Sequence, residues 1–461
     1  MTSFIGKFLS IFVLAAASAL GGERAGLNAH QALAVAIFVA SISGTLFFWE
    51  VRLGFAFLGT VILVLTNAIP LEQLITYASL DVILFLVGMM IVVGLLKYAG
   101  FFAWIVELIL RMRHLTARRF VAVITCVSAA LSATTGEVVS IIFMVAAILE
   151  ICDYFETDPI PYILISVFAT NIGSAATVLG NPIGILIASK SGLTSEDFLL
   201  RALPLSVLCL AVMLVIVLVW YRKALDAFDV KIKELGANDI LIRLISVPIG
   251  RELRVGLALM AVTMALITVS HRLELFLGLE NNAVLMVVPL AMAALVMLWK
   301  RDRARDFVEK DVEWWSLLFF MMLFAQAGTL KHTGATDVFA QGVMGWAHGS
   351  PGVLGSLVLW TGTIGSSLMD NVVIVVAAIP IIKSFPATGA AMENFWWALL
   401  FGGCLGGNIT MIGSTANIVA IGVLEKEKGI RVSFFQWLTV GSIVGIVTTA
   451  CVWGALWLAH R

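Results

Sequence analysis

One segment decides the fold of this chain: Thr170-Asn171-Ile172-Gly173-Ser174-Ala175-Ala176-Thr177-Val178-Leu179-Gly180-Asn181-Pro182. It interrupts an apolar run, residues 160–188, that is long enough to cross a bilayer. Pro182 lacks a backbone donor and pushes the residue before it out of the helical region. Inside a bilayer the freed backbone groups must be satisfied by protein or by a water-lined cavity. We therefore predict a helix broken near Gly173 to Pro182 that faces a polar cavity, as in secondary transporters.

A second segment repeats this pattern. Residues 404–417, Cys-Leu-Gly-Gly-Asn-Ile-Thr-Met-Ile-Gly-Ser-Thr-Ala-Asn, interrupt the apolar run 395–424. An offset of 233 in residue number superimposes Gly173 on Gly406, Thr177 on Thr410 and Gly180 on Gly413. Glycine alone also serves as a packing residue in membrane helices. Two polar interruptions at corresponding places in two halves point instead to a transport site.

The composition predicts an all-α polytopic membrane protein. The chain has 461 residues, of which 61% are hydrophobic and 13% charged, and soluble domains are neither so apolar nor so poor in charge. The near-continuous apolar runs disfavour a β-barrel. A net charge of zero without a basic arm argues against a nucleic-acid partner. The five cysteines lack metal-type spacing and no phosphate-binding loop is present. We expect no cofactor, no metal beyond a transported Na⁺, and no ATP drive.

The remaining apolar runs predict the other helices. They cover residues 5–20, 31–48, 55–69, 81–110, 203–221, 255–269, 283–299, 314–330 and 434–458. Gly100 is expected to bend the fourth of these runs. The run 5–20 fits either an uncleaved first helix, which we favour, or a cleaved signal peptide.

Two further runs are interrupted by polar residues and predict re-entrant hairpins. The first, residues 120–152, contains Ser132-Ala133-Thr134-Thr135-Gly136-Glu137, and the second, residues 353–382, contains Ser366-Ser367-Leu368-Met369-Asp370-Asn371. Residues 222–254 carry seven Lys and Arg and predict a cytoplasmic linker. This linker would divide the chain into a first repeat, 1–221, and a second repeat, 255–461.

Positive charge predicts the orientation, because cytoplasmic loops are rich in Lys and Arg. If both interrupted runs are hairpins, the basic segments all fall on the cytoplasmic side; they are Arg52, 111–119, 222–254, 300–310 and 426–431. The two broken helices then run in opposite directions. The expected fold is two inverted repeats with about 11 transmembrane helices, two re-entrant hairpins and two broken helices. We expect a multi-pass protein of the cell (inner) membrane with its N-terminus in the cytoplasm.

Two acidic residues lie inside the interrupted runs, Glu137 in the first and Asp370 in the second. A charge at bilayer depth is costly unless it is paired, protonated or facing water. An offset of 233 pairs Glu137 with Asp370, whereas an offset of 234 pairs Glu137 with Asn371, and the sequence leaves both open. Either acid can be a solvated residue at a hairpin end. We favour a carboxylate that binds the coupling ion, Na⁺ or H⁺.

The motifs resemble a known family. Ser367-Leu368-Met369-Asp370-Asn371-Val372 and residues 396–419, with residues 171–182 in the first half, are similar to the ion transporter superfamily. The nearest branch is that of arsenite permeases, D-type sodium–proton antiporters and the pink-eyed-dilution protein, which shares a citrate-transporter-like domain. The resemblance covers roughly residues 30 to 460. It implies inverted repeats, each with a scaffold part and a mobile transport part, and a homodimer formed through the scaffold parts.

The resemblance also implies a substrate site between the hairpin tips and the helix breaks. Carried over by position, it consists of Ser132, Thr134, Asn171, Gly173, Thr177, Gly180, Asn181, Ser366, Ser367, Asn371, Asn408, Thr410, Gly413, Ser414, Thr415 and Asn417, with Asp370 and Glu137 for the coupling ion. One departure stands out. Relatives of this branch commonly have an Asp-Asn pair in the first hairpin, where this chain has Gly136-Glu137.

These features favour a secondary active transporter for a small anion, oxyanion or hydroxide of the arsenite or carboxylate type, coupled to H⁺ or Na⁺. Helix amide ends near Asn181 and Ser414 favour an oxyanion, and the four interruptions contain no Arg or Lys. A Na⁺/H⁺ antiporter is the alternative. Duplicated halves with broken helices favour alternating access over a channel. A membrane-embedded enzyme is disfavoured because the sequence contains no motif such as His-Glu-x-x-His or Gly-x-Ser-x-Gly.

Overall fold

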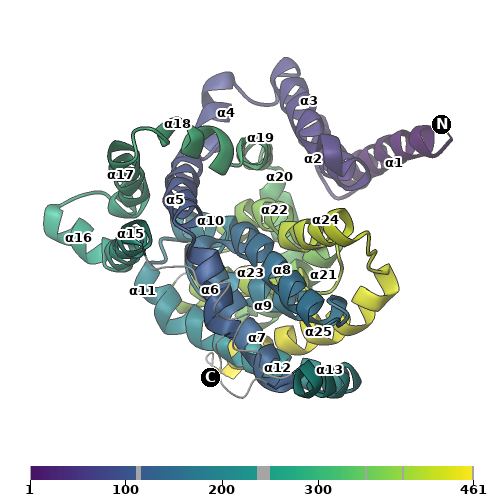
Figure 1. Ribbon diagram of the computed structural model, residues 1–461. Helices are drawn as coiled ribbons and strands as arrows, with labels where there is room; N and C mark the ends of the chain where they lie inside the picture. The colour runs from purple at the N-terminus through teal and green to yellow at the C-terminus, as the bar shows by residue number, and fades with distance from the viewer. Residues whose placement is uncertain (1, 111–115, 236–249, 348–349, 387–388, 459–461) are drawn as a thin grey trace. The chain divides into compact units, whose positions relative to one another are not determined.

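The structure is a computed structural model that describes residues 2–110, 116–235, 250–347, 350–386 and 389–458. Throughout these ranges the chain forms helices and turns and no strand (Figure 1). Six described helices are long and apolar enough to cross a membrane, or seven if the bent pair α15–α16 counts as one span. The chain is therefore a polytopic α-helical membrane protein. The total of about 11 spans stays a prediction.

The helices before residue 250 follow the predicted apolar runs closely. They are α1 (Thr2–Arg24), α2 (Ala29–Phe47), α3 (Arg52–Leu65), α4 (Leu71–Tyr77), α5 (Leu80–Tyr98), α6 (Phe101–Leu110), α7 (Ala117–Thr135), α8 (Glu137–Tyr154), α9 (Ile160–Ser174), α10 (Pro182–Ser191), α11 (Ser195–Asp197), α12 (Leu203–Trp220) and α13 (Arg222–Leu235), with the short π-helix Phe198–Ala202 before α12. The expected bend is present at Gly100, whose φ of +78° suits glycine. The short helix α4 was not predicted.

The helices after residue 250 agree equally well. They are α15 (Arg251–Thr268), α16 (Ser270–Leu277), α17 (Ala283–Trp299), α18 (Ala304–Asp306), α19 (Trp314–His332), α20 (Ala335–Trp346), α21 (Pro351–Leu368), α22 (Asn371–Lys383), α23 (Ala390–Gly406), α24 (Thr415–Lys428) and α25 (Phe434–Leu458), with the π-helix Phe307–Asp311 after α18. The helices α16 and α20 were not predicted.

The segment expected as a linker starts as a helix. Residues 222–235 form α13, which packs on α7. Phe228 is buried, and its ring lies 5.6 Å from that of Phe120 and 5.3 Å from that of Tyr162. The apolar side of an amphipathic helix thus packs where a solvated linker was expected. Residues 236–249 of the predicted linker and 111–115 of the predicted basic loop lie outside the described residues.

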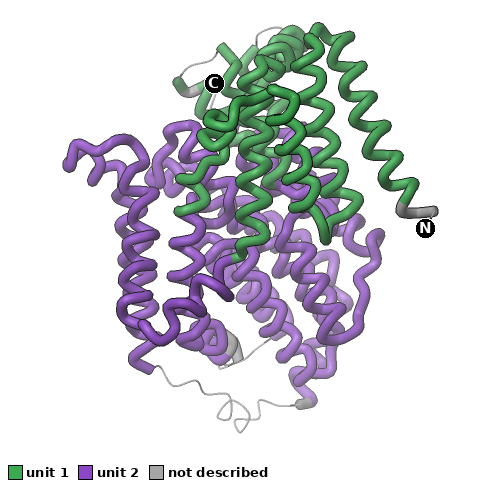
Figure 2. Tube along the Cα trace, turned by 90° about the horizontal axis from the view of Figure 1, so that it is seen from above, with its two compact units in different colours: residues 1–84, 313–358, 372–399 green, residues 85–312, 359–371, 400–461 purple. Residues whose placement is uncertain are grey.

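The chain divides into two compact units, coloured separately in Figure 2. Unit 1 comprises Met1–Leu84, Glu313–Val358 and Val372–Leu399, and unit 2 comprises Phe85–Val312, Leu359–Asn371 and Leu400–Arg461. Each unit takes residues from both predicted repeats. In unit 1, α19 packs on α3, where the buried Gln326 amide donates to the Ala56 carbonyl at 2.7 Å. In unit 2, α7 packs along α9, and α24 packs on α8.

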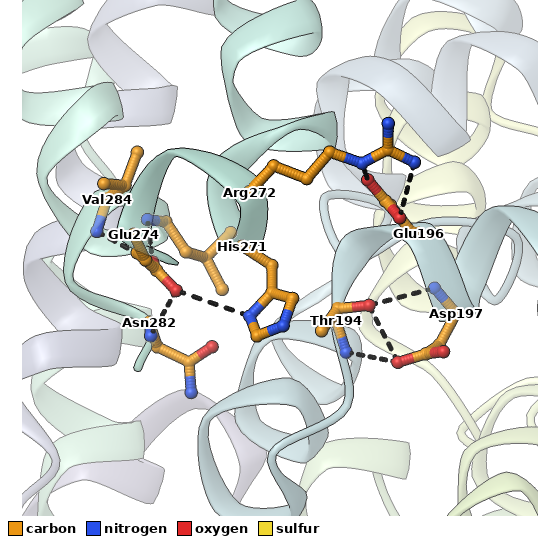
Figure 3. Close-up of polar contacts among 9 residues, drawn as sticks. Thr194, Glu196, Asp197, His271, Arg272, Glu274, Asn282 and Val284 are labelled. Carbon is orange, nitrogen blue, oxygen red and sulfur yellow. Dashed lines mark hydrogen bonds and ion pairs between the residues drawn. The ribbon is translucent and has the colours of Figure 1, made fainter. Parts of the chain in front are cut away.

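A bent helix pair in unit 2 is held by polar contacts (Figure 3). The axes of α15 and α16 differ by 63°. The buried Glu274 carboxylate of α16 accepts from the backbone N–H groups of Asn282 at 3.0 Å and Val284 at 2.9 Å, which precede and open α17. Arg272 forms an ion pair with Glu196 at 2.6 Å. Glu274 thereby satisfies donors that a helix start otherwise leaves unpaired.

Candidate functional site

Both predicted helix breaks are present. The first break, residues 175–181, separates α9 from α10, and the second break, residues 407–414, separates α23 from α24. A polar residue caps the helix after each break. Asn181 Oδ1 accepts from the Gly184 N–H at 2.9 Å, and Ser414 Oγ accepts from the Ala416 N–H at 3.2 Å. The helices after the two breaks therefore begin at corresponding places, related by the offset of 233.

Both interrupted runs are helix pairs joined by a tight turn, as expected. The first hairpin is α7–α8, which turns at Gly136, and the second hairpin is α21–α22, which turns at Met369 and Asp370. Gly136 has a φ of +89°, a conformation that side-chain-bearing residues rarely adopt. Re-entry of the hairpins into the membrane stays a prediction.

One threonine in each break is bonded to the tip of a hairpin. Thr177 Oγ1 donates to the Ala133 carbonyl and Thr410 Oγ1 donates to the Ser367 carbonyl, both at 2.5 Å. Each hydroxyl also accepts a backbone N–H two residues later, from Leu179 at 3.2 Å in the first break and its counterpart at 3.3 Å in the second. The same hydroxyl thus orders its own break and ties it to a hairpin.

These contacts decide the register between the two hairpins. The threonines are related by the offset of 233, but the carbonyls that they bond, those of Ala133 and Ser367, are related by an offset of 234. The close contacts of Gly173 and Gly406, which lie just before the two breaks, give the same register. A Cβ at Gly173 would meet Ala129, and one at Gly406 would meet Thr363, again at the offset of 234. Glu137 therefore corresponds to Asn371, and Gly136 corresponds to Asp370.

A buried asparagine cluster joins the end of α9 to the second break and to α24 within unit 2. Asn171 Nδ2 donates to Asn408 Oδ1 and to Asn417 Oδ1, both at 2.9 Å. Asn417 Nδ2 in turn donates to the carbonyls of Gly407 at 2.7 Å and Thr410 at 2.8 Å. Asn171 Oδ1 and Asn408 Nδ2 are buried without a hydrogen-bond partner among the described residues. Because such atoms are costly to leave unsatisfied, they are available to a polar ligand.

A cysteine that the sequence analysis did not single out, Cys404, links the first break to α23. Asn181 Nδ2, in the first break, donates to Ser174 Oγ at 2.8 Å and to Cys404 Sγ of α23 at 3.1 Å. Cys404 corresponds to Asn171 at the offset of 233. This correspondence with Asn171 could have indicated from the sequence that Cys404 lies at the site. It was missed because a thiol stands where the first half has an amide.

The two acids lie beside these clusters, and each is almost fully buried. Glu137 is 3% exposed and Asp370 is 2% exposed. The Glu137 carboxyl lies against Asn371, Ser174 and Asn181 and interacts electrostatically with Asp370. Its Oε2 atom has no well-formed hydrogen bond to a described residue. Asp370 Oδ2 accepts from Thr415 Oγ1 at 2.5 Å, at the first residue of α24.

Most residues expected at the site lie around these contacts. Unit 2 gathers Glu137, Asn171, Gly173, Thr177, Gly180, Asn181, Ser366, Ser367, Asp370, Asn371, Asn408, Thr410, Gly413, Ser414, Thr415 and Asn417 at the hairpin turns and the breaks. Two others show no described side-chain contact with a break. The Thr134 hydroxyl bonds back to the Ala130 carbonyl of its own helix, and Ser132 Oγ is buried without a hydrogen-bond partner among the described residues.

This arrangement of broken helices and hairpin turns fits the comparison with known proteins. A family model described as citrate transporter matches residues 37–402. The chain belongs to the citrate transporter family. An uncharacterized transporter of Mycobacterium tuberculosis (strain ATCC 25618 / H37Rv) is 29% identical over 384 residues, covering 82% of this chain and 86% of that protein. This confirms the transporter class.

Two further relatives place this citrate transporter family member more closely. An uncharacterized transporter of Synechocystis is 24% identical over 442 residues, covering 88% of this chain and 91% of that protein. The human P protein is 24% identical over 461 residues, covering 85% of this chain and 54% of the P protein. The resemblance to the pink-eyed-dilution branch of the ion transporter superfamily is thereby confirmed.

Proposed function

We propose that this protein is a secondary active transporter that moves a small anion of the carboxylate or oxyanion type together with Na⁺ or H⁺. One observation carries the proposal. Asn171, in the last turn of α9 before the first break, is hydrogen-bonded to Asn408 in the second break and to Asn417 in α24, and buried polar atoms of Asn171 and Asn408 are left without partners among the described residues. Unwound helices that meet at a polar centre are how secondary transporters hold ions inside the membrane.

The cation half of the proposal rests on the two acids. Glu137 and Asp370 are both almost fully buried and interact electrostatically with each other. Two carboxylates that repel each other favour binding of a cation beside them. A Na⁺ or a proton supplies that charge, so cation binding would make the site ready for the anion.

The anion half rests on the two helix starts. The helices α10 and α24 begin at Pro182 and Thr415, directly after the capping residues Asn181 and Ser414. A helix N-terminus carries partial positive charge and presents N–H groups. The four interruptions contain no Arg or Lys. The helix N–H groups alone therefore suit a small anion or an uncharged hydroxide rather than a tightly held multivalent anion.

The recurring threonine contact supports two structurally related repeats, and the inverted topology that the loop charges predict would allow alternating access. Thr177 and Thr410 make the same bond to corresponding hairpins. We propose a multi-pass protein of the inner cell membrane, with a cytoplasmic N-terminus, that forms a homodimer. Duplicated broken helices favour a carrier over a channel.

Uptake into proteoliposomes tests the function. Radiolabelled citrate, succinate, arsenite and sulfate are offered with an inward Na⁺ gradient, a proton gradient or neither. We expect saturable, gradient-driven uptake and counterflow for at least one anion. Flux that does not saturate, or that ignores both gradients, would overturn the proposal.

Na⁺/H⁺ antiport without an anion is the second candidate, and the adjacent acids favour it. Glu137 and Asp370 interact electrostatically, so both can serve one exchange site that alternates between Na⁺ and protons. A pH dye inside the same proteoliposomes decides between the two functions. Dequenching on addition of Na⁺ without any anion would support antiport.

A further inference from the structure

The short helix α16 and the turn after it carry an exposed apolar surface, which we call the α16 apolar surface. It consists of Leu275, Phe276, Leu277 and Leu279, all of them exposed, and the Phe276 side chain is 86% exposed. A single exposed apolar side chain is ordinary on a protein, but a contiguous group of large ones indicates an interaction surface.

The opposite side of α16 fixes its orientation. Ser270 and Glu274 lie one turn apart, are both buried, and form the inner side of the helix. The Glu274 carboxylate accepts from the backbone N–H groups of Asn282 and Val284 (Figure 3). Because a helix rotates by about 100° per residue, Phe276 lies on the side opposite Glu274. The contacts of Glu274 thus determine which side chains of α16 face outward.

The helix α16 does not extend the span that precedes it. α15 has 18 residues, a length of about 27 Å, and α17 has 17 residues, a length of about 26 Å. The hydrocarbon layer of a bilayer is about 30 Å thick, so each of these helices nearly crosses it alone. The axis of α16 departs from that of α15 by 63°. A bend of this size at the end of a span directs α16 along the membrane surface.

The residues around the α16 apolar surface suit the boundary between lipid and water. Arg272 of α16 forms an ion pair with Glu196, and Glu280 beyond the end of the helix is exposed. Such charges are costly in hydrocarbon and belong near water. The adjoining spans expose apolar side chains, such as Val262 of α15 and Val287 of α17, as lipid-facing helices do. The α16 apolar surface therefore lies between lipid-facing spans and charged groups.

We propose that α16 is an interfacial helix, whose apolar surface is buried at the boundary between the headgroups and the acyl chains of the bilayer. The apolar side of such a helix enters this boundary by about 5–10 Å. Lipid fits better than a second copy of this chain, because four side chains offer less area than the roughly 800 Å² per partner of a stable protein interface. The basic segments 222–254 and 300–310, which we expect in the cytoplasm, adjoin the far ends of α15 and α17, so α16 belongs to the outer leaflet.

The test is the accessibility of nitroxide spin labels on the full chain in proteoliposomes, measured by electron paramagnetic resonance. Labels are attached to Phe276→Cys and, as a matched control, to Glu280→Cys. The two cysteines that are not buried are first removed by Cys126→Ala and Cys451→Ala. We expect the label at residue 276 to collide more with oxygen, which dissolves in lipid, than with a water-soluble nickel chelate. The label at residue 280 should show the reverse order, and Leu275→Cys should behave like Phe276→Cys.

Two results would overturn the inference. If the label at residue 276 collides mainly with the nickel chelate, the α16 apolar surface faces water. If that label is protected from both reagents and its spectrum sharpens when labelled protein is diluted with unlabelled protein, a second copy covers the surface. None of these signals depends on transport, so either result would leave the proposed function standing.

Discussion

Thr177 and Thr410 make the same hydrogen bond in two halves of the chain, because each Oγ1 donates over 2.5 Å to a carbonyl at the tip of a helical hairpin. The bonded carbonyls belong to Ala133 and Ser367. Their spacing aligns Glu137 with Asn371 and not with Asp370. The acids are therefore displaced by one residue in corresponding hairpins, and the two halves of the site are chemically unequal.

Asp370→Asn tests this inequality. The amide keeps an oxygen that can accept the Thr415 hydroxyl, so the variant should fold and insert normally. It removes the charge, and we expect the Na⁺ or pH dependence of uptake to be lost. Uptake is measured against both gradients, with the amount of protein in the membrane as the control. Unchanged cation dependence would remove Asp370 from the coupling role.

Thr410→Val tests the bond between the second break and its hairpin. The variant keeps the shape of the side chain but removes the donor to the Ser367 carbonyl. Losing a buried hydrogen bond costs about 1–3 kcal/mol, so we expect the KM for the anion to rise about tenfold. Thr410→Ser restores the hydroxyl and should restore the KM. Thr177→Val should act similarly through the Ala133 carbonyl; normal kinetics in both valine variants would place the substrate site elsewhere.

Asn171→Ala tests the hydrogen bonds that join α9 to the second break and to α24. Without its amide, Asn408 Oδ1 and Asn417 Oδ1 lose their shared donor, at a cost of about 1–3 kcal/mol for each unsatisfied group. We expect loss of uptake and a lower Tm in detergent. Asn171→Asp should be at least as harmful because a carboxylate cannot donate. The exposed Asn281→Ala is the control and should change neither quantity; full activity of Asn171→Ala would contradict the proposed junction.

Gly173→Ala tests the close approach of α9 and α7. A Cβ at Gly173 would lie 2.4 Å from the backbone of Ala129, so the helices must separate, and overpacking of this kind costs about 1–3 kcal/mol. We expect a lower Tm. Gly422→Ala in α24 has no atom within 4 Å of the new Cβ and should be neutral or slightly stabilising. Equal Tm values for both variants would contradict the packing of α7 on α9.

Glu274→Gln tests the polar contacts of Figure 3. The carboxylate accepts from the N–H groups of Asn282, Val284 and Leu285 at the start of α17. A glutamine has one acceptor oxygen and no charge, so we expect a loss of about 1.5–3 kcal/mol, seen as a lower Tm. The exposed Glu280→Gln is the matched control. A Tm unchanged by Glu274→Gln would show that the amides find other partners.

The helices and their interruptions were largely predictable because their causes are local. Pro182 and Gly136 restrict or permit particular backbone conformations wherever they occur, and both breaks begin within a few residues of the predicted places. The exceptions are short helices such as α4 and α20, which the apolar runs did not reveal. The helix α13 was also missed, because its charged residues hid the buried face around Phe228.

The sequence by itself determined that this is a membrane protein with two polar helix breaks, since apolar length and backbone restrictions act within a few neighbouring residues. Only the tertiary structure decided which atoms meet between segments that lie far apart in the sequence. It brought Asn171 to Asn408 and Cys404 to Asn181, and it selected the offset of 234 for the hairpins. The physical reason is that such contacts depend on how closely packed helices seat against one another, and a change of one residue in register alters every partner without changing any local propensity.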